Sequence, residues 1–294
     1  MFKAPRVLVL GSTGMLGHQL CNYLINNSDY TLFDIARNSK FRKETALIDV
    51  RNERKLLDYI KDVRPNYIIN CVGVLISGSN KNIEEAIFIN SYLPHMLARI
   101  SDEIKSKLIH ISTDCVFSGK KGQYIETDHR DGQGIYAQTK ILGEIVDNKN
   151  LTLRTSVIGP EIRDNGEGLF HWFMSQENEI LGFTKAIWSG VTTIELAKVI
   201  KWSVDRRITG LYHVTNNSTI TKYELLDLFN KHTKKNINIK KFESKFVDKS
   251  FVDTRLLLNH TIPSYDKMIF EMIETIVKNR PLYSQYKAIY FDKE

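Results

Sequence analysis

Two side chains one helical turn apart, Tyr136 and Lys140, carry the clearest chemical signal in this sequence. Residues four apart on a helix share one face, so the phenol and the ammonium group point the same way. A free tyrosine has a pKa of about 10, and a phenol that exchanges protons near neutrality needs a shift of roughly three units, or about 4 kcal/mol. A neighbouring cation stabilises phenolate and supplies part of that shift. The pair predicts proton transfer at a carbonyl or alcohol oxygen, although a surface tyrosine beside a solvated lysine has the same spacing.

A second polar group, residues 112–115 (STDC), comes directly after the apolar run 107–111. The run predicts a buried strand, and polar side chains at the end of such a strand are placed to meet a ligand. We expect the Thr113 hydroxyl to donate a hydrogen bond to the same substrate oxygen that Tyr136 serves. Asp114 is expected to order its own turn.

A glycine-rich turn near the N-terminus supplies the context for these residues. The apolar strand 6–10 (RVLVL) runs into Gly11, Gly14 and Gly17, and an amphipathic helix is predicted over 18–25. Gly11 permits the tight turn, Gly14 lets the backbone approach a pyrophosphate, and Gly17 lets the helix pack closely. The helix N-terminus then offers free N–H groups to the phosphates. The alternative is a structural turn that binds nothing.

The end of the second predicted strand, 30–35, bears on the choice of cofactor. Arg37, with Ser39 beside it, suits a 2′-phosphate and hence NADP, whereas Asp34 would favour a free 2′-hydroxyl. Asp49 would then lie near the adenine amine, or would serve equally well as a carboxylate at a helix N-terminus.

Further strands and helices alternate along the first 155 residues. Strands are predicted over 67–70, 108–111 and 151–155, and helices over 53–63, 83–100 and 136–147. This order predicts an α/β fold with a Rossmann-type, doubly wound parallel sheet and right-handed connections. Ligands of such sheets bind beyond the carboxyl ends of the strands, where the glycine turn, 70–73, Thr113 and Tyr136 all fall.

The pattern of predicted strands and helices changes after residue 160. Helices are predicted over 192–202, 223–232 and 268–277, with a last sheet strand at 211–214. We predict a dinucleotide-binding domain over 1–157, completed by about 189–215, and a smaller, discontinuous substrate domain within 158–294.

Composition sets broad limits. The chain has 294 residues, 42% hydrophobic and 26% charged, as in ordinary globular proteins. Three scattered cysteines without a CxxC pair suit a reducing cytoplasm and argue against a zinc site. We find no run of about 18 apolar residues and no signal peptide, so no membrane association is expected. The net charge of +7 favours anionic ligands or reflects a solvated lysine-rich surface, and no basic block predicts nucleic-acid binding.

Together these motifs resemble the extended short-chain dehydrogenases/reductases, and within them the dTDP-4-dehydrorhamnose reductase group. The resemblance rests on GSTGMLG (11–17), Asn70, Asn90, ISTDCVFSGKKGQYIETD (111–128), YAQTK (136–140) and LRTSVIGPE (153–161), and covers the first 160 residues best. It implies that NADPH delivers hydride to C4 of a nucleotide-linked 4-keto-6-deoxyhexose. Tyr136 would protonate the new alkoxide, Lys140 would hold the nicotinamide ribose and tune Tyr136, and Thr113 would orient the carbonyl. The implied cofactor-binding residues are Gly11, Thr13, Gly14, Met15, Gly17, Arg37, Asp49, Val50, Cys71, Val72, Gly73, Asn90, Tyr136 and Lys140.

Cys115 departs from the rhamnose reductases, which commonly have an aromatic residue in this stretch, and residues 187–191 depart as well. GDP-fucose synthase and related 3,5-epimerase/4-reductases resemble this chain in having a cysteine two residues after the position of Thr113. There it exchanges the proton next to the 4-keto group, with a histidine or lysine as partner. His171 falls near the place of that histidine. A bifunctional 3-epimerase/4-reductase acting on a UDP-2-acetamido-2,6-dideoxy-hexos-4-ulose in polysaccharide biosynthesis is therefore favoured, with Cys115 as a buried thiol and His171 as a core or stacking residue as the alternatives.

Two other functions stay open. One is a pure dTDP-4-dehydrorhamnose-type reductase. The other is a non-catalytic NADP-binding regulatory subunit, since the regulatory beta subunit of methionine adenosyltransferase resembles the same group. By analogy with the superfamily, helices near 83–100 and 136–147 are expected to form a homodimer interface.

Overall fold

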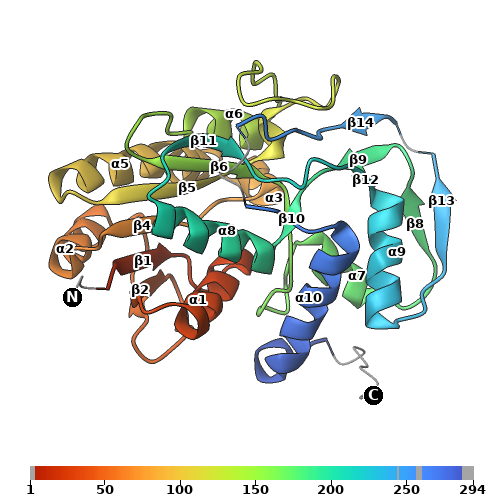
Figure 1. Cartoon of the computed structure of the whole chain (residues 1–294), viewed down its shortest axis with the longest axis horizontal. Helices are drawn as coiled ribbons and strands as arrows, with labels where there is room; N and C mark the ends of the chain where they lie inside the picture. Colours follow the sequence, from red (N-terminus) through yellow and green to blue (C-terminus); the bar gives the residue numbers. More distant parts are fainter. Residues whose placement is uncertain (1–3, 244, 256–259, 287–294) are drawn as a thin grey trace.

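The computed structural model describes residues 4–243, 245–255 and 260–286 (Figure 1). Its centre is a seven-stranded sheet in the order β11-β6-β5-β4-β1-β2-β3, in which every pair is parallel. The strands are β1 (Arg6–Leu10), β2 (Thr31–Ala36), β3 (Ala46–Leu47), β4 (Tyr67–Asn70), β5 (Lys107–Thr113), β6 (Leu151–Thr155) and β11 (Gly210–His213). The predicted doubly wound α/β fold is confirmed. The strand order reverses between β1 and β4, which makes the carboxyl end of β1 the switch point where such sheets bind ligands.

The apolar run in β1 faces two separate cores. Val7 and Val9 join one buried cluster, and Leu8 and Leu10 join the other. Successive residues of a strand point to opposite faces, so a run without polar residues is what a strand buried on both sides requires. The first cluster is covered by α1 (Met15–Asn27) and α8 (Thr193–Arg206), and the second by α2 (Glu53–Val63) and α5 (Leu93–Glu103).

The predicted helix 83–100 is broken by a wider turn. It consists of α4 (Ile83–Ile87), a π-helical segment (Phe88–Tyr92) and α5, preceded by the short α3 (Ile76–Lys81). Asn90 lies in the π segment, and its side chain accepts from Val74 N at 2.9 Å and donates to Val74 O at 2.9 Å. The wide turn therefore aims this amide at the loop after β4, a common use of such bulges.

The helix predicted over 136–147 is shorter than expected. It is α6 (Ile135–Leu142), and Gly143 is its C-cap. A Cβ at Gly143 would lie 1.8 Å from Asn90 O, so the chain can pass the π segment only as glycine. The prediction was wrong for 143–147 because helical periodicity continued past a residue that the packing requires to leave the helix.

The rest of the chain builds small elements beside the large sheet, at the right of Figure 1. Three short sheets pair β10 with β7, β9 with both β12 and β14, and β13 with β8. Their bounds are β7 (Val157–Ile158), β8 (Ile180–Phe183), β9 (Ala186–Trp188), β10 (Val191–Thr192), β12 (Ile220–Thr221), β13 (Ile239–Phe242) and β14 (Val247–Asp248). The helices are α7 (Leu169–Ser175), α9 (Lys222–Thr233) and α10 (Tyr265–Lys278), followed by a 3₁₀ turn (Arg280–Tyr283). The sequence analysis missed these strands of two to four residues, and its domain boundaries stay a prediction.

Candidate active site

The glycine turn after β1 is shaped by close backbone contacts. Gly11 has φ +86°, and a Cβ at Gly17 would lie 2.0 Å from Gly11 O. Gly14 is the N-cap of α1 and makes no side-chain hydrogen bond to the helix. The first N–H groups of the helix, next to Thr13 and Met15, are therefore left without a capping side chain. This arrangement leaves hydrogen-bond donors and the positive end of the helix dipole free for a phosphate group.

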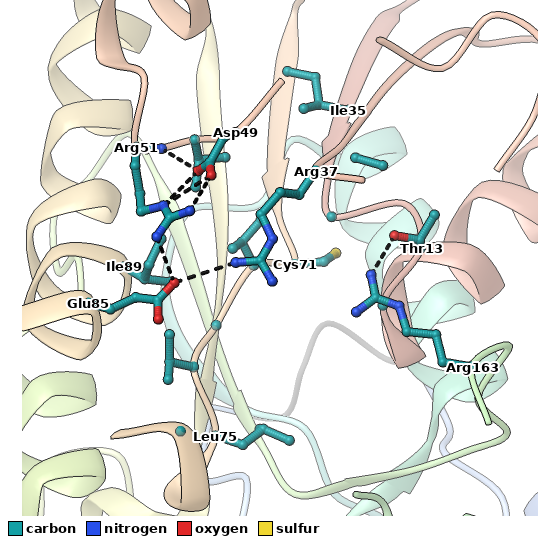
Figure 2. A pocket seen from close by; sticks show the side chains of 18 of the residues that line it. Thr13, Ile35, Arg37, Asp49, Arg51, Cys71, Leu75, Glu85, Ile89 and Arg163 are labelled. Carbon is teal, nitrogen blue, oxygen red and sulfur yellow. Dashed lines mark hydrogen bonds and ion pairs between the residues drawn. The ribbon is translucent and has the colours of Figure 1, made fainter. Parts of the chain in front are cut away.

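The turn forms one end of a cavity of about 380 Å³ (Figure 2). The loop after β4 forms another wall, and Arg37 and Arg51 stand at the far end. The predicted cofactor residues that line the cavity are Gly11, Thr13, Gly14, Arg37, Asp49, Val50, Cys71, Val72 and Gly73. Residues that the sequence analysis did not assign to it include Arg51, Glu85, Glu161, Asn165 and Glu167.

The cationic end of the cavity is organised around one shared carboxylate. Glu85 pairs with Arg37 at 3.4 Å and with Arg51 at 3.3 Å, and Arg51 also binds Asp49. The Arg51 hydrogen bond holds the pKa of Asp49 below its usual range. The side chain of Arg37 remains 50% exposed and points into the cavity, as Figure 2 shows. Two guanidinium groups at one end make this the natural place for a phosphate monoester.

Asp34 does not compete for that ligand. Its carboxylate is fully buried, accepts from Arg42 Nε at 2.7 Å, and does not line the cavity. From the sequence, we expected Asp34 and Arg37 to favour different cofactors. Asp34 has no such effect here, because Arg42, eight residues further on, forms an ion pair with its carboxylate. The helix-cap alternative for Asp49 is not realised either, since Asn52 is the N-cap of α2.

The opposite wall of the cavity comes from the segment after β7. Arg163 Nη2 donates to Thr13 Oγ1 at 2.9 Å, so the glycine turn is covered by a residue 150 positions further on (Figure 2). The backbone of Glu161 is held in turn by the Tyr286 hydroxyl, to which Glu161 N donates at 2.9 Å.

Thr113 and Tyr136 meet at the carboxyl end of β5. The Thr113 hydroxyl is near enough to the phenol to act on its pKa, and it donates to Asp114 Oδ1 at 3.0 Å and accepts from Cys115 N at 3.1 Å. Burial and the nearby Cys115 raise the pKa of Tyr136, against the smaller opposing effect of Thr113. A protonated phenol held beside a second hydroxyl is a proton donor aimed at one oxygen atom.

Lys140 is anchored behind this pair. Its Nζ donates to Ile111 O at 2.8 Å, and burial lowers its pKa to about 8, with Glu144 opposing that shift. Glu144 itself is clamped by Arg154 Nε at 2.7 Å and accepts from Ser112 Oγ at 2.6 Å. The groups that act on the pKa of Tyr136 are its own burial, Cys115, Thr113 and Asp114, so the tuning expected from Lys140 is not visible in this structure.

Cys115 has a cation beside it, but not the predicted one. Lys249 Nζ lies 3.5 Å from Cys115 Sγ. Burial and Asp114 raise the pKa of the thiol to about 11, and Lys249 opposes them. His171 is engaged elsewhere: its Nδ1 lies 2.9 Å from the Tyr286 hydroxyl and its Nε2 lies 3.1 Å from Asp164 O. The structure therefore brings Lys249 to Cys115 and leaves His171 at the C-terminal segment.

The other five predicted cofactor residues do not line the cavity: Tyr136 and Lys140, described above, and Met15, Gly17 and Asn90. Gly17 packs on Gly11, Met15 begins α1, and Asn90 fixes the loop at Val74. Among the residues that sequence reasoning missed, Arg51 had a local signal, since it follows Asp49 by two positions. Lys249 had none, because its partner lies 134 positions earlier.

A glycine turn at the switch point and a Thr113-Tyr136-Lys140 set at the carboxyl end of β5 and in α6, two strands away in the sheet, define an enzyme of the short-chain dehydrogenase/reductase type. Residues 5–249 match the family model described as RmlD substrate binding domain, and the chain belongs to this family. It is 26% identical over 232 residues to dTDP-4-dehydrorhamnose reductase of Aggregatibacter actinomycetemcomitans, covering 74% of this chain and 76% of the relative.

One further relative and one solved structure are also similar. The chain is 26% identical over 234 residues to methionine adenosyltransferase 2 subunit beta of Xenopus laevis, covering 75% of this chain and 70% of the relative. A crystal structure of dTDP-4-dehydrorhamnose reductase from Bacillus anthracis in complex with NADP superposes with a TM-score of 0.79 at 23% identity, covering 93% of this chain and all of the other. Within the described residues, no helix is long and apolar enough to span a membrane, and no group of acidic, histidine or cysteine side chains has the arrangement of a metal site.

Proposed function

We propose that this chain catalyses the NADPH-dependent reduction of the C4 keto group of a nucleotide-linked 4-keto-6-deoxyhexose. The observation that carries the proposal is the Tyr136 phenol, kept protonated by burial, beside Thr113 at the end of the strand next to the one whose loop walls the cavity. When bound, the cofactor would supply the hydride. Tyr136 would donate its proton to the C4 oxygen, and Thr113 would orient that oxygen.

The cavity supports a dinucleotide with a 2′-phosphate. Its phosphate end would be held by the backbone around Gly11, Thr13 and Gly14, at the start of α1, with Met15 and Gly17 keeping the turn in shape. Arg37 and Arg51 would bind the 2′-phosphate, since Asp34 is withdrawn into its pair with Arg42. Asp49 and Val50 would meet the adenine, and 71–73, placed by Asn90, would support the rest. Lys140 would hold the nicotinamide ribose beside Tyr136.

We further propose that reduction is coupled to C3 epimerisation through Cys115, with a UDP-linked 2-acetamido-2,6-dideoxy-hexos-4-ulose as substrate. Cys115 acts on the pKa of Tyr136 and contacts a cation, so the thiol shares one site with the phenol. A pure dTDP-4-dehydrorhamnose-type reductase is the alternative. In deuterated water, the wild type should incorporate deuterium at C3 and Cys115→Ser should not, whereas a pure reductase gives no Cys115-dependent label at C3.

A different class of function has support in one relative. The match to methionine adenosyltransferase 2 subunit beta supports a chain that assembles with another protein, and under this alternative the chain would bind NADP and the partner without turning over substrate. The complete set of Thr113, Tyr136 and Lys140 supports the enzyme instead. NADPH binding without oxidation of cofactor by any 4-keto nucleotide sugar would decide for the regulatory function.

A homodimer and a cytoplasmic location are part of the same proposal. The helices expected at the interface expose apolar side chains, with Ile87 50% and Leu142 64% exposed. The described cysteines Cys21, Cys71 and Cys115 are unpaired, which suits a reducing compartment.

The decisive experiment is NADPH oxidation across a panel of UDP-, dTDP- and GDP-linked 4-keto-6-deoxy sugars, with the products identified by NMR. The expected result is turnover with the UDP-2-acetamido ketone and a product inverted at C3. Turnover of dTDP-4-dehydrorhamnose alone, without inversion, would replace the favoured substrate by the alternative.

A further inference from the structure

Two lysines from the C-terminal part of the chain reach the same place at the end of β5. Lys249 contacts Cys115 Sγ directly at 3.5 Å. Lys222, the first residue of α9, lies against Trp188 of β9, and β9 pairs with β14, which ends one residue before Lys249. Neither lysine belongs to a motif of the nucleotide-binding part, and the reduction as described above needs neither.

Lys249 is held in place by the backbone around it. On one side, Asp248 N donates to Gly119 O at 2.9 Å, and on the other, Tyr124 N donates to Ser250 O at 2.9 Å. The segment therefore lies against the loop that follows Cys115, and the Lys249 side chain passes over Gly119, where a Cβ would lie 3.0 Å from Lys249 Cγ. Backbone hydrogen bonds therefore hold the residues on both sides of Lys249, and such a lysine loses little further conformational entropy when it pairs with a thiolate.

Lys222 is placed by a strand pair and a helix cap. Ile220 pairs with Trp188 across β12 and β9, and a capping box of Thr221 and Glu224 begins α9. The Lys222 Nζ consequently lies 5.2 Å from the centre of the Trp188 ring.

Lys222 has no hydrogen bond or ion pair within the described residues. Other lysines that are buried or partly buried do have such partners. Lys140 binds Ile111 O, and Lys198 binds Glu195 and Glu271. Burial lowers the pKa of Lys222 to about 8, with Asp114 and Cys115 opposing that shift. A partly buried amine that lies beside an aromatic ring and has no hydrogen-bonded carboxylate is suited to exchanging a proton with a ligand.

Inversion at a carbon next to a carbonyl needs two proton-transfer groups. One group takes the proton, and the electrons of the broken C–H bond form an enolate with the carbonyl. The second group returns a proton to the same carbon from the other face. No electrons are gained or lost overall, and no further reactant is needed.

We propose that Cys115 and Lys222 are these two groups, and that Lys249 is a positioning residue that stabilises the Cys115 thiolate. This inference rests on the proposed epimerisation. The two groups belong to different elements, Cys115 to the turn at the end of β5 and Lys222 to the start of α9, and we place the sugar ring between them.

The test of Lys222 follows C3 deuterium exchange of UDP-2-acetamido-2,6-dideoxy-hexos-4-ulose in deuterated water, read by NMR without NADPH, and NADPH oxidation with the same ketone. Lys222→Met should lower the exchange at least ~100-fold, the usual size of a lost acid–base group. Lys241→Met is the matched control, because Lys241 Nζ also lies 5.2 Å from an aromatic ring, that of Tyr223, but is solvent-exposed. Equal loss in both variants, or no loss in Lys222→Met, would overturn the assignment.

The test of Lys249 needs no substrate. The rate of Cys115 alkylation by iodoacetamide is followed against pH by peptide mass spectrometry, with Cys115→Ser as the blank. Lys249→Met should slow alkylation at pH 8 roughly tenfold, because removing the cation raises the pKa of the thiol, and Lys249→Arg should restore most of the rate. An unchanged pH profile in Lys249→Met would overturn its role.

The two tests separate the possible failures. Wild-type protein that oxidises NADPH without C3 exchange would refute the epimerisation and the Lys222 role together. Wild-type exchange that survives in Lys222→Met would leave the epimerisation standing and refute only the role of Lys222.

Discussion

The cofactor side and the sugar side of this molecule are built in different ways. On the cofactor side, the strand, the glycine turn and the helix that would bind phosphates are consecutive in the chain, over Arg6–Leu10, 11–14 and Met15–Asn27. On the sugar side, Cys115 contacts Lys249 across 134 positions, and its charge acts on Lys222 at the start of α9. A local unit can be kept whole while distant residues change, so this division allows one reductase scaffold to serve different sugars.

Tyr136→Phe gives the largest expected effect and tests whether the cofactor side and the sugar side are separable. Loss of the phenolic proton should lower kcat for NADPH oxidation about 10³-fold, within the range for a general acid. Binding of NADPH, measured by fluorescence titration, should change less than about twofold, because the hydroxyl does not line the cavity. Weakened cofactor binding together with retained turnover would mean that the two sides are not separable.

A methyl group at Gly17 should damage the cofactor side alone. A Cβ there would lie 2.0 Å from Gly11 O, whereas a Cβ at Gly14 would lie 3.3 Å from the same atom. Gly17→Ala should therefore cost about 3 kcal/mol of unfolding free energy in urea titrations and abolish NADPH binding. Gly14→Ala is the matched control and should retain the fold; equal stability of the two variants would contradict the close approach.

Arg37→Ala should sharpen the choice between cofactors. Removing one guanidinium from the half-exposed pair should raise the Kd for NADPH about tenfold, or ~1.4 kcal/mol, and leave the Kd for NADH nearly unchanged. Arg54→Ala, an exposed arginine on α2 outside the cavity, is the control. An equal loss for both cofactors would place the 2′-phosphate elsewhere.

The smallest expected effect is a pH dependence at the start of α1. His18 is fully buried, its Nε2 lies 2.9 Å from the Tyr283 hydroxyl, and burial lowers its pKa to about 4 from 6.5. Because the unfolded chain takes up a proton near pH 6.5 and the folded chain only near pH 4, stability should fall as the pH drops through that window. Between pH 6.5 and 4.5, the free energy of unfolding measured by thermal unfolding should fall by about 1–2 kcal/mol less for His18→Gln than for the wild type. Identical slopes would show that His18 is protonated in the folded protein.

Local patterns predicted the fold and the cofactor turn well. The runs that became β1, α2, β4 and β6 were placed at the bounds the structure has, because each is decided by a short stretch of periodic residues. Prediction failed where packing decides. Helix α6 ends at Gly143 because Asn90 O leaves no room for a side chain, and the helix 83–100 carries a π segment that periodicity does not reveal.

The sequence by itself determined the α/β architecture, the turn that receives phosphates and the Thr113–Tyr136–Lys140 set, because residues that are neighbours in the chain define each of them. Only the tertiary structure decided that Asp34 is occupied by Arg42, that His171 binds Tyr286, and that Lys249 is the cation at Cys115. Those outcomes depend on which side chain the folded structure places next to a given charge or thiol. Burial then fixes the result, since a polar group removed from water must keep the partner that the fold brings to it.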